Sequence, residues 1–314
     1  MAIYEIWADE AWTHCGLPLN RYWCFFGGIM GPQSDLERLD IELSKVKSAF
    51  NIQGEVAWGN VRGRNLNGYR AFVDCALDLI QRTDLRFRQV FLDRSLIRLN
   101  EQGTITPIAD LDLQYRIYYQ FLKHAFGLRF LPPAKGPGPD RVLIRLDDHS
   151  SQRHKRDLET FVTGLPGTLG RRDLDVEVTF RDSAKSCRLQ ACDLLIGAAG
   201  SHGNKAHLRR APNQRGKTPK QQVRYEMAKY VYNKLRALDA SERGSAAFNW
   251  FESTGLSGQI RNLFDYKLRI WKFKPALYHI DKGWQNDHLD KQGRYQAADI
   301  TILPSPQPDL DETF

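Results

Sequence analysis

The chain has 314 residues, 42% of them hydrophobic and 26% charged, which is an ordinary globular composition and enough chain for a full core. It has no run of about 18 apolar residues and no basic, then apolar N-terminal segment, so we expect neither a membrane span nor a secretory signal. The five cysteines form no CxxC pair, which argues against a zinc cluster and favours reduced thiols in the cytoplasm. The net charge of +8 favours polyanionic partners, chiefly nucleic acid, although many basic proteins bind none.

Apolar residues recur along most of the chain with the two-residue period of strands or the three-to-four-residue period of helices. The expected order is strand 3–9, strand 22–30, helix 36–50, helix 69–80, strand 87–93, helix 113–122, strand 141–147, helix 151–162, strand 176–182, helix 188–200, helix 221–238 and an edge strand 267–273. Strands followed by strand–helix alternation predict an α/β protein, with a mixed sheet and helices on both faces.

The domain organisation follows from changes in composition along the chain. We expect one domain over residues 1–275, with a core at 3–200 and a helical and edge-strand elaboration at 201–275. Residues 276–314 are expected to form a C-terminal extension with a flexible tail, because the end is rich in proline and acidic residues.

Three apolar strands among those predicted end in an aspartate, namely Asp9, Asp93 and Asp147, and the alternating strand 176–182 ends in Asp182. One such residue has a simple explanation, because loops often begin with aspartate. Several carboxylates that meet at one end of a sheet would instead repel one another, and their pKa values would rise unless a cation held them charged.

Asp193 lies in the helix-forming segment LQACDLLIGAAG, whose other residues are almost all apolar. Gln190, Asp193 and Gly197 are three and four residues apart, so they form one narrow stripe along the helix. A carboxylate there needs a metal or an ionic partner, and the structural alternative is an ion pair with an arginine. We expect Gly197 to let this stripe approach the sheet closely.

Two other acidic positions have simpler readings from sequence alone. Asp182 ends a strand and opens the run DSAKS, whose residues are natural turn and N-cap residues, and Lys185 in that run is a candidate phosphate contact. Glu55 lies in the short segment GEVAW between two helices and looks like an ordinary loop acid.

Five short segments carry a resemblance to a known family. They are ADEAW at 8–12, EVAW at 55–58, LDR at 92–94, LDDHS at 146–150 and the block from 182 to 197 that contains LQACDL. In this order they resemble motifs of the family known as domain of unknown function 3800, a branch of the RNase H-like superfamily. The likeness covers about residues 3 to 200, and its last block is the most specific.

The resemblance implies an RNase H-like fold and a metal-dependent nuclease that hydrolyses phosphodiester bonds of DNA or RNA. It implies that four carboxylates hold two divalent ions, with Asp9 between them, Asp147 and Asp193 beside it, and Glu55 completing the site. Oxygen ligands of this kind suit Mg²⁺ or Mn²⁺. The second-choice site residues are Glu10, Asp93, Asp148, Asp182 and Lys185. Phage defence or a mobile element is the setting that the resemblance implies.

Residues 201–224 form a basic segment that contains no acidic residue and directly follows the helix of Asp193. The predicted nucleic-acid contacts are Lys205, Arg209, Arg210, Arg215, Lys217 and Lys220. Such a segment can place cations beside the metal site and hold a phosphate backbone. The alternative is a solvated loop without a partner.

Two other functions stay open at this point. The chain departs from the family pattern at Ala11-Trp12, where the family has Ser-Gly, and at Ala57, where it has a lysine. A catalytically inactive nucleic-acid-binding or scaffold subunit is therefore one alternative. A metal-dependent hydrolase of a small phosphorylated molecule is the other, and strong salt dependence of binding would argue against it.

Overall fold

The computed structural model describes most of the chain. The described residues are 3–11, 23–93, 96–97, 110–133, 140–148, 152–204, 206, 215–245, 253–255, 258–274, 277–281 and 300–304. Within them, no helix is long and apolar enough to cross a membrane. Four cysteines in these ranges are free thiols, namely Cys24, Cys75, Cys187 and Cys192.

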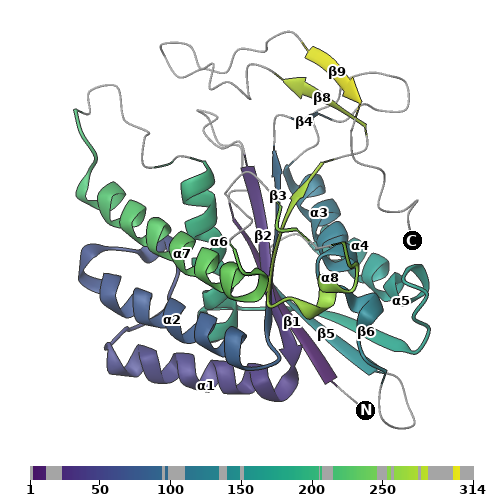
Figure 1. The fold of residues 1–314 in the computed structure, drawn as a ribbon, viewed down its shortest axis with the longest axis horizontal. Helices are drawn as coiled ribbons and strands as arrows, with labels where there is room; N and C mark the ends of the chain where they lie inside the picture. Colours follow the sequence, from purple (N-terminus) through teal and green to yellow (C-terminus); the bar gives the residue numbers. More distant parts are fainter. Residues whose placement is uncertain are drawn as a thin grey trace.

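A six-stranded mixed sheet forms the centre of the molecule, with strand order β6-β5-β1-β2-β3-β7 (Figure 1). The strands are β1 (Ile3–Ala11), β2 (Trp23–Pro32), β3 (Arg86–Asp93), β5 (Asp140–Asp147), β6 (Leu174–Arg181) and β7 (Leu268–Phe273). Strand β2 runs antiparallel to both β1 and β3, whereas β1, β5 and β6 are mutually parallel and β7 is parallel to β3. The first strand is therefore central, and β7 is an edge strand as predicted.

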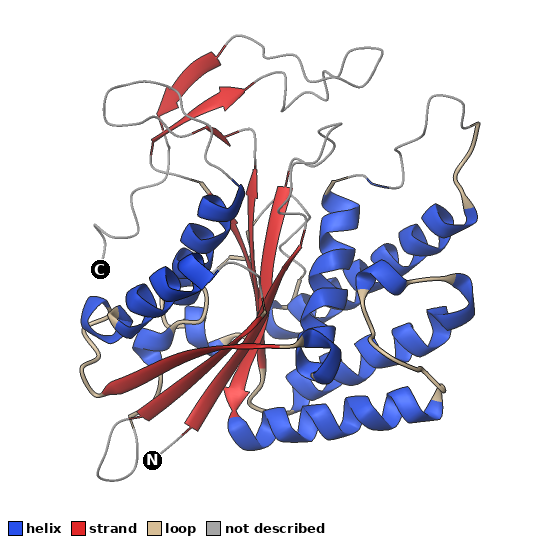
Figure 2. Ribbon diagram, turned by 180° about the vertical axis from the view of Figure 1, so that it is seen from behind, coloured by secondary structure: helices blue, strands red, loops and turns tan. Residues whose placement is uncertain are grey.

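Helices cover both faces of this sheet, as Figure 2 shows with the sheet between two layers. One layer holds α1 (Gln33–Ala49), α2 (Leu66–Arg82), α6 (Cys187–Gly203) and α7 (Pro219–Arg243). The other holds α3 (Asp110–His124), α4 (Gln152–Thr163), α5 (Leu165–Thr168) and α8 (Asn262–Asp265). Each face of the sheet has its own hydrophobic core, which confirms the prediction of an α/β protein with a mixed sheet flanked by helices.

Helix α6 lies directly on the sheet because small residues allow it. A Cβ atom at Gly27 of β2 would come within 2.2 Å of Ile196 of α6, and one at Gly203 of α6 would come within 2.9 Å of the Phe25 ring. The helix begins at Ser186, whose side chain accepts a hydrogen bond from the backbone N–H of Leu189 at 3.4 Å. The close contacts of Ile196 and Gly203 hold the C-terminal half of α6 against β2.

Every helix and strand expected from sequence is present, with ends that differ by a few residues. The periodicity that predicted the first helix corresponds to a buried face, since Leu36, Leu39 and Leu43 of α1 are buried.

A second sheet was not predicted. Its strand order is β4-β8-β9, and its strands are Leu96–Ile97, Leu277–Asp281 and Ile300–Pro304. Strands β8 and β9 fall in the expected extension 276–314, and the expected tail beyond Pro304 lies outside the described residues.

Candidate functional site

Asp9 and Asp147 stand side by side at the end of the sheet where β1 and β5 finish. The two strands are parallel neighbours, and Ala8 pairs in register with Leu146. Both of these residues are buried in the core under α3, so the next residue on each strand points to the opposite face, which α6 covers. Asp9 is buried with 6% of its surface exposed, whereas Asp147 is partly exposed and accepts a hydrogen bond from the Ser183 N–H at 3.1 Å.

The polar stripe of α6 binds the segment that contains Glu55. The Gln190 side chain accepts a hydrogen bond from the Val56 N–H at 3.1 Å, and the Asp193 Oδ2 atom accepts one from the Trp58 N–H at 2.7 Å. A Cβ atom at Gly197 would lie 2.4 Å from the Trp58 side chain. The expectation that Gly197 approaches the sheet was therefore wrong, because its missing side chain makes room for the Trp58 indole.

The alternative prediction, an ion pair between Asp193 and an arginine, is not found among the described residues. Among them, no cationic side chain forms an ion pair with Asp193, whose carboxylate accepts a hydrogen bond from a backbone amide. Asp193 is partly buried, although its neighbours along α6 are almost all buried. The Asp193 side chain is therefore largely shielded from water, and the Trp58 N–H bonds to only one of its two carboxylate oxygens.

The pKa shifts of Asp9 and Asp193 indicate that the four predicted carboxylates lie within electrostatic range of one another. Burial raises the pKa of Asp9 well above its usual value, and the charges of Glu10, Asp193 and Asp147 raise it further. Burial also raises the pKa of Asp193 to about 6, with Glu55 and Asp147 adding to the shift and the Trp58 N–H opposing it. We call Asp9, Glu55, Asp147 and Asp193 the carboxylate cluster.

Two of the second-choice acids lie near this cluster but are already engaged. Glu10 accepts hydrogen bonds from the Gln114 amide at 2.6 Å and from the Tyr118 hydroxyl, both on α3, so it faces the opposite side of the sheet from Asp9. Asp148 is exposed and pairs with the Lys155 ammonium of α4. Helix α3 and helix α4 thus neutralise or bind the acids that point away from α6.

Asp182 and Lys185 form an exposed ion pair with each other at 3.4 Å, and the Asp182 Oδ1 atom caps the following turn through the Ala184 N–H. These contacts are the turn and capping role that the sequence also allowed. Neither residue lies among the groups that shift the pKa values of Asp9 and Asp193.

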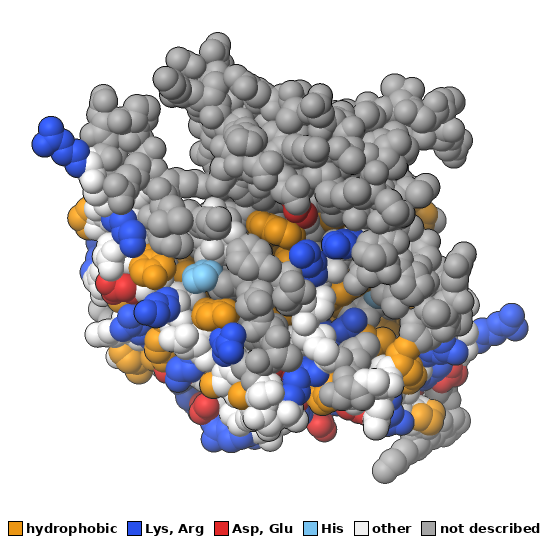
Figure 3. Space-filling view, turned by 45° about the horizontal axis from the view of Figure 1, so that its top comes forward, with side chains coloured by type: hydrophobic (Ala, Val, Ile, Leu, Met, Phe, Trp, Pro, Cys, Tyr) orange, Lys and Arg blue, Asp and Glu red, His pale blue; other side chains and the backbone are white. Residues whose placement is uncertain are grey.

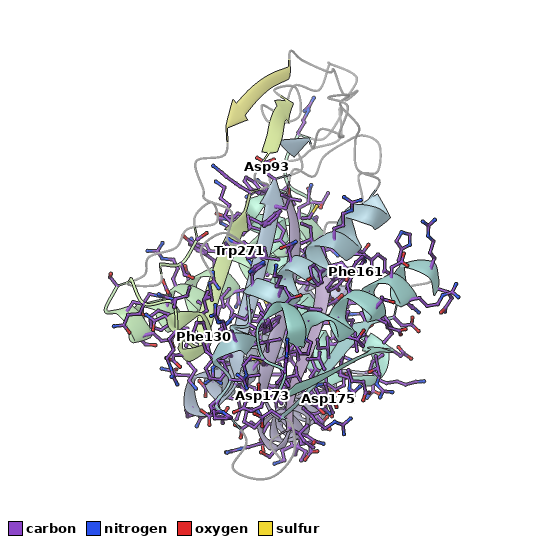
Figure 4. The ribbon with its side chains drawn as sticks, turned by 90° about the vertical axis from the view of Figure 1, so that its right-hand side faces the viewer. Asp93, Phe130, Phe161, Asp173, Asp175 and Trp271 are labelled. Carbon is purple, nitrogen blue, oxygen red and sulfur yellow. The ribbon has the colours of Figure 1, made fainter. Side chains whose placement is uncertain are left out.

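Asp93 shares the same end of the sheet but not the cluster. It pairs in register with Trp23 of β2, whereas Asp9 is opposite Gly27. It therefore lies two strands away and about 13 Å further along the sheet, at ~3.3 Å per residue. Figure 4 shows Asp93 at the end opposite to Asp173 and Asp175.

The predicted basic contacts divide into two groups. Lys205, Arg209 and Arg210 lie outside the described residues, whereas Arg215, Lys217 and Lys220 are described and exposed. The Lys217 ammonium lies 4.2 Å from the centre of the Tyr225 ring. Two further cations meet beside Trp58: Arg62, from the segment after Glu55, and Arg224, from the end of the basic segment 201–224. No local pattern reveals their contact.

The carboxylate cluster has the donor chemistry of a divalent-cation site. All its donors are carboxylate oxygens, which suit Mg²⁺ and Mn²⁺, and their mutual repulsion would be relieved by a cation. Within the part of the chain that the structure describes, no three Asp, Glu, His or Cys side chains already stand in position to ligate one ion. A cation at the cluster would therefore require these side chains to turn toward it.

No protein-family model matches the sequence, and no curated protein matches it either. The function is therefore inferred from the residues, their neighbours and their charges.

Proposed function

We propose that the protein is a divalent-metal-dependent nuclease that hydrolyses phosphodiester bonds of DNA or RNA at the carboxylate cluster. The observation that carries this proposal is the environment of Asp9, a buried carboxylate at a strand end with three further acids close enough to raise its pKa. No described Lys, Arg or His forms an ion pair with Asp9. Burial of a carboxylate among like charges costs free energy, and a bound cation would offset that cost.

The sheet supports the proposal that the fold is RNase H-like. Its first strand is central, with the antiparallel β2 on one side and the parallel β5 on the other. An acid at the end of β1, an acid at the end of the adjacent β5 and an acid on a helix across that face together match what the family resemblance implies. A fold alone does not determine function, so the proposed activity depends on these acidic side chains.

The residues of the cluster would have distinct tasks. Asp9 is central because the charges of Asp147 and Asp193 both raise its pKa, so these three carboxylates together would hold the divalent ions. The Ser183 N–H donates to one carboxylate oxygen of Asp147, and the Trp58 N–H donates to one of Asp193. Bound Mg²⁺ or Mn²⁺ would supply Lewis-acid activation of water and of the phosphodiester. Glu55 would complete the ligand set or position the attacking water.

The test is incubation of the purified chain with DNA and RNA panels in Mg²⁺, Mn²⁺ or EDTA. We expect cleavage only with a divalent metal, and we expect Asp9→Asn to reduce it by more than the roughly 10–100-fold that outer-sphere partners of a metal typically contribute. The matched control is Asp175→Asn, which removes an exposed carboxylate at the far end of the sheet.

Other results would favour the other two functions. Binding of nucleic acid without cleavage in any metal would favour a scaffold subunit. Hydrolysis of small phosphate esters without cleavage of either polymer would favour a small-molecule hydrolase. Cleavage that persists unchanged in Asp9→Asn would place the active site elsewhere.

A further inference from the structure

Three cations gather beside the carboxylate cluster from two separate parts of the chain. Lys220 and Arg224 lie one turn apart on the same side of the first part of α7, and Arg62 follows the short 3-10 helix Trp58–Asn60. The two parts are in contact, since the Arg224 Nη2 atom donates hydrogen bonds to the Gly59 carbonyl at 2.6 Å and to the Trp58 carbonyl at 3.3 Å.

The two guanidinium groups share one acceptor. The Arg62 Nη1 atom donates to the same Gly59 carbonyl at 2.9 Å and to the Val61 carbonyl at 2.8 Å. Because both groups bond to the Gly59 oxygen, they are held side by side despite their like charge. Backbone carbonyls thus fix the directions of both guanidinium planes, and a fixed guanidinium is well suited to bind a phosphate.

The positive charge of this group is not neutralised within the part of the chain that the structure describes. No acidic side chain there forms an ion pair with Arg62, Lys220 or Arg224, and the buried Arg224 Nε atom has no hydrogen-bond partner. Further along α7, by contrast, Lys234 pairs with Asp74 at 2.8 Å. The charge of Arg224, then that of Arg62, lowers the pKa of Lys220, which is the sign of cations that repel one another.

The position of these cations relates them to the carboxylate cluster. Trp58 connects the cations to the carboxylate cluster. Its backbone N–H donates a hydrogen bond to Asp193, and its carbonyl oxygen accepts one from Arg224. Arg224 is also close enough to Asp193 for the carboxylate to raise the arginine pKa, although burial and Arg62 lower it. An anion bound by the three cations would therefore lie next to the carboxylates, on the α7 side of Trp58.

Figure 3 shows one face of the molecule with its side chains coloured by type. Lys and Arg side chains are spread over the described surface there, with few Asp or Glu among them. Such a surface suits a long polyanion better than a single small anion.

We propose that Arg62, Lys220 and Arg224 form a phosphate-binding site that holds a polynucleotide backbone phosphate next to the one at the carboxylate cluster. The choice of a polynucleotide as ligand rests on the proposed nuclease function, whereas the anion site itself does not. We call these three residues the cation triad. It fixes the register of the strand, because contacts to a phosphate set position without reading sequence.

The test measures binding in EDTA, so that cleavage cannot contribute. Labelled single-stranded DNA and RNA are titrated with the full chain over a range of salt concentrations, and inorganic phosphate is titrated in parallel. We expect Lys220→Glu and Arg62→Gln each to weaken oligonucleotide binding by about 10-fold, and each to make the slope of log affinity against log salt shallower by roughly one. Lys220 is exposed, so its substitution leaves the fold intact.

The matched control is Lys229→Glu, which reverses an exposed lysine elsewhere on α7. We expect this control to change affinity much less than Lys220→Glu. Equal losses in the two variants, or wild-type affinity and slope in Arg62→Gln/Lys220→Glu, would overturn the triad. Inorganic phosphate that binds as tightly as the oligonucleotides would overturn the assignment to a polymer.

The outcome is separable from that of the nuclease proposal. Asp9→Asn leaves the cation triad untouched, so this variant should bind oligonucleotides in EDTA at least as well as the wild type. Binding that depends on the triad without cleavage in any metal would refute the nuclease alone. Metal-dependent cleavage with binding that is indifferent to Arg62 and Lys220 would refute the triad alone.

Discussion

The two ends of the main sheet both carry aspartates, but among the described residues only the end where β5 and β6 begin has arginines in ion pairs with them. Where β5 and β6 begin, Asp140 is buried with its Oδ2 atom 3.8 Å from Arg171, and Arg171 also lies 2.9 Å from Asp173. Where β1 and β5 finish, Asp9 is also buried, and no described cationic side chain pairs with it. Figure 4 places Asp173 and Asp93 at these opposite ends.

The pKa shifts at the two ends have opposite signs. The hydrogen bond from Arg171 lowers the pKa of Asp173, whereas burial and acidic neighbours raise those of Asp9 and Asp193. At the first end the aspartates are therefore neutralised by arginines, and these ion pairs contribute to the stability of the fold. At the second end, neither Asp9 nor Asp193 has an ion-pair partner among the described residues, which is the arrangement expected where a cation is to be bound.

The largest effect on stability should come from the neutralised end. Replacing Arg171 by Met leaves the Asp140 carboxylate buried with no cation, and it removes hydrogen bonds to the carbonyls of Arg129 and Leu131. Loss of one partner from a buried pair costs about 3 kcal/mol, so we expect that decrease in the free energy of unfolding, measured in urea.

The control is Arg82→Met, which breaks the exposed pair with Asp78 on α2 and should cost less than about 1 kcal/mol. Adding Asp140→Asn to Arg171→Met should recover part of the loss, since the stranded charge is then gone. Equal costs for Arg171→Met and Arg82→Met would mean that the buried aspartate is not held by its arginine.

The second effect separates the two ends by their response to metal. Mn²⁺ at about 100 times its dissociation constant should stabilise the wild type by about 2.7 kcal/mol, because a ligand that binds only the folded state stabilises it by mass action. Asp9→Asn with Asp193→Asn should abolish the rise in melting temperature, whereas Asp173→Asn with Asp175→Asn should keep it. An unchanged rise in the first double variant would show that the metal binds elsewhere.

Much of the fold could be predicted because its signals are local. Periodicity defined α1 through Leu36, Leu39 and Leu43, and continuous apolar runs defined the buried strands. The small sheet β4-β8-β9 escaped prediction because its strands are short and joined across distant parts of the chain. Short strands carry too few residues for a period to be recognised.

The carboxylate cluster was predictable only in part. Asp9 and Asp147 meet because adjacent parallel strands end together, which strand assignment alone implies. The docking of Trp58 on α6 depends on the path of an irregular segment, so neither its bond to Asp193 nor its contact with Gly197 could be read from sequence. The same holds for the meeting of Arg62 with Arg224.

The smallest effect concerns pH and follows from the sign of the Asp193 shift. Its pKa is raised from 3.8 to about 6 in the folded chain, so the folded state holds the proton more tightly than the unfolded state does. The stabilisation is therefore present below the unfolded pKa and is lost as pH rises through about 6. We expect the metal-free wild type to lose about 1–2 kcal/mol of stability from this group between the two values, since Asp193 is partly exposed.

Urea unfolding in EDTA over this pH range measures that loss by comparison with Asp193→Asn, whose amide cannot ionise but can still accept from the Trp58 N–H. The difference in stability between wild type and variant should therefore shift in favour of the variant as pH rises. Saturating Mn²⁺ should remove that shift in the wild type, because a cation favours the charged carboxylate. Parallel pH curves for the two proteins in EDTA would mean that Asp193 ionises as freely as in the unfolded chain, and the contrast between the two ends of the sheet would then rest on Asp9 alone.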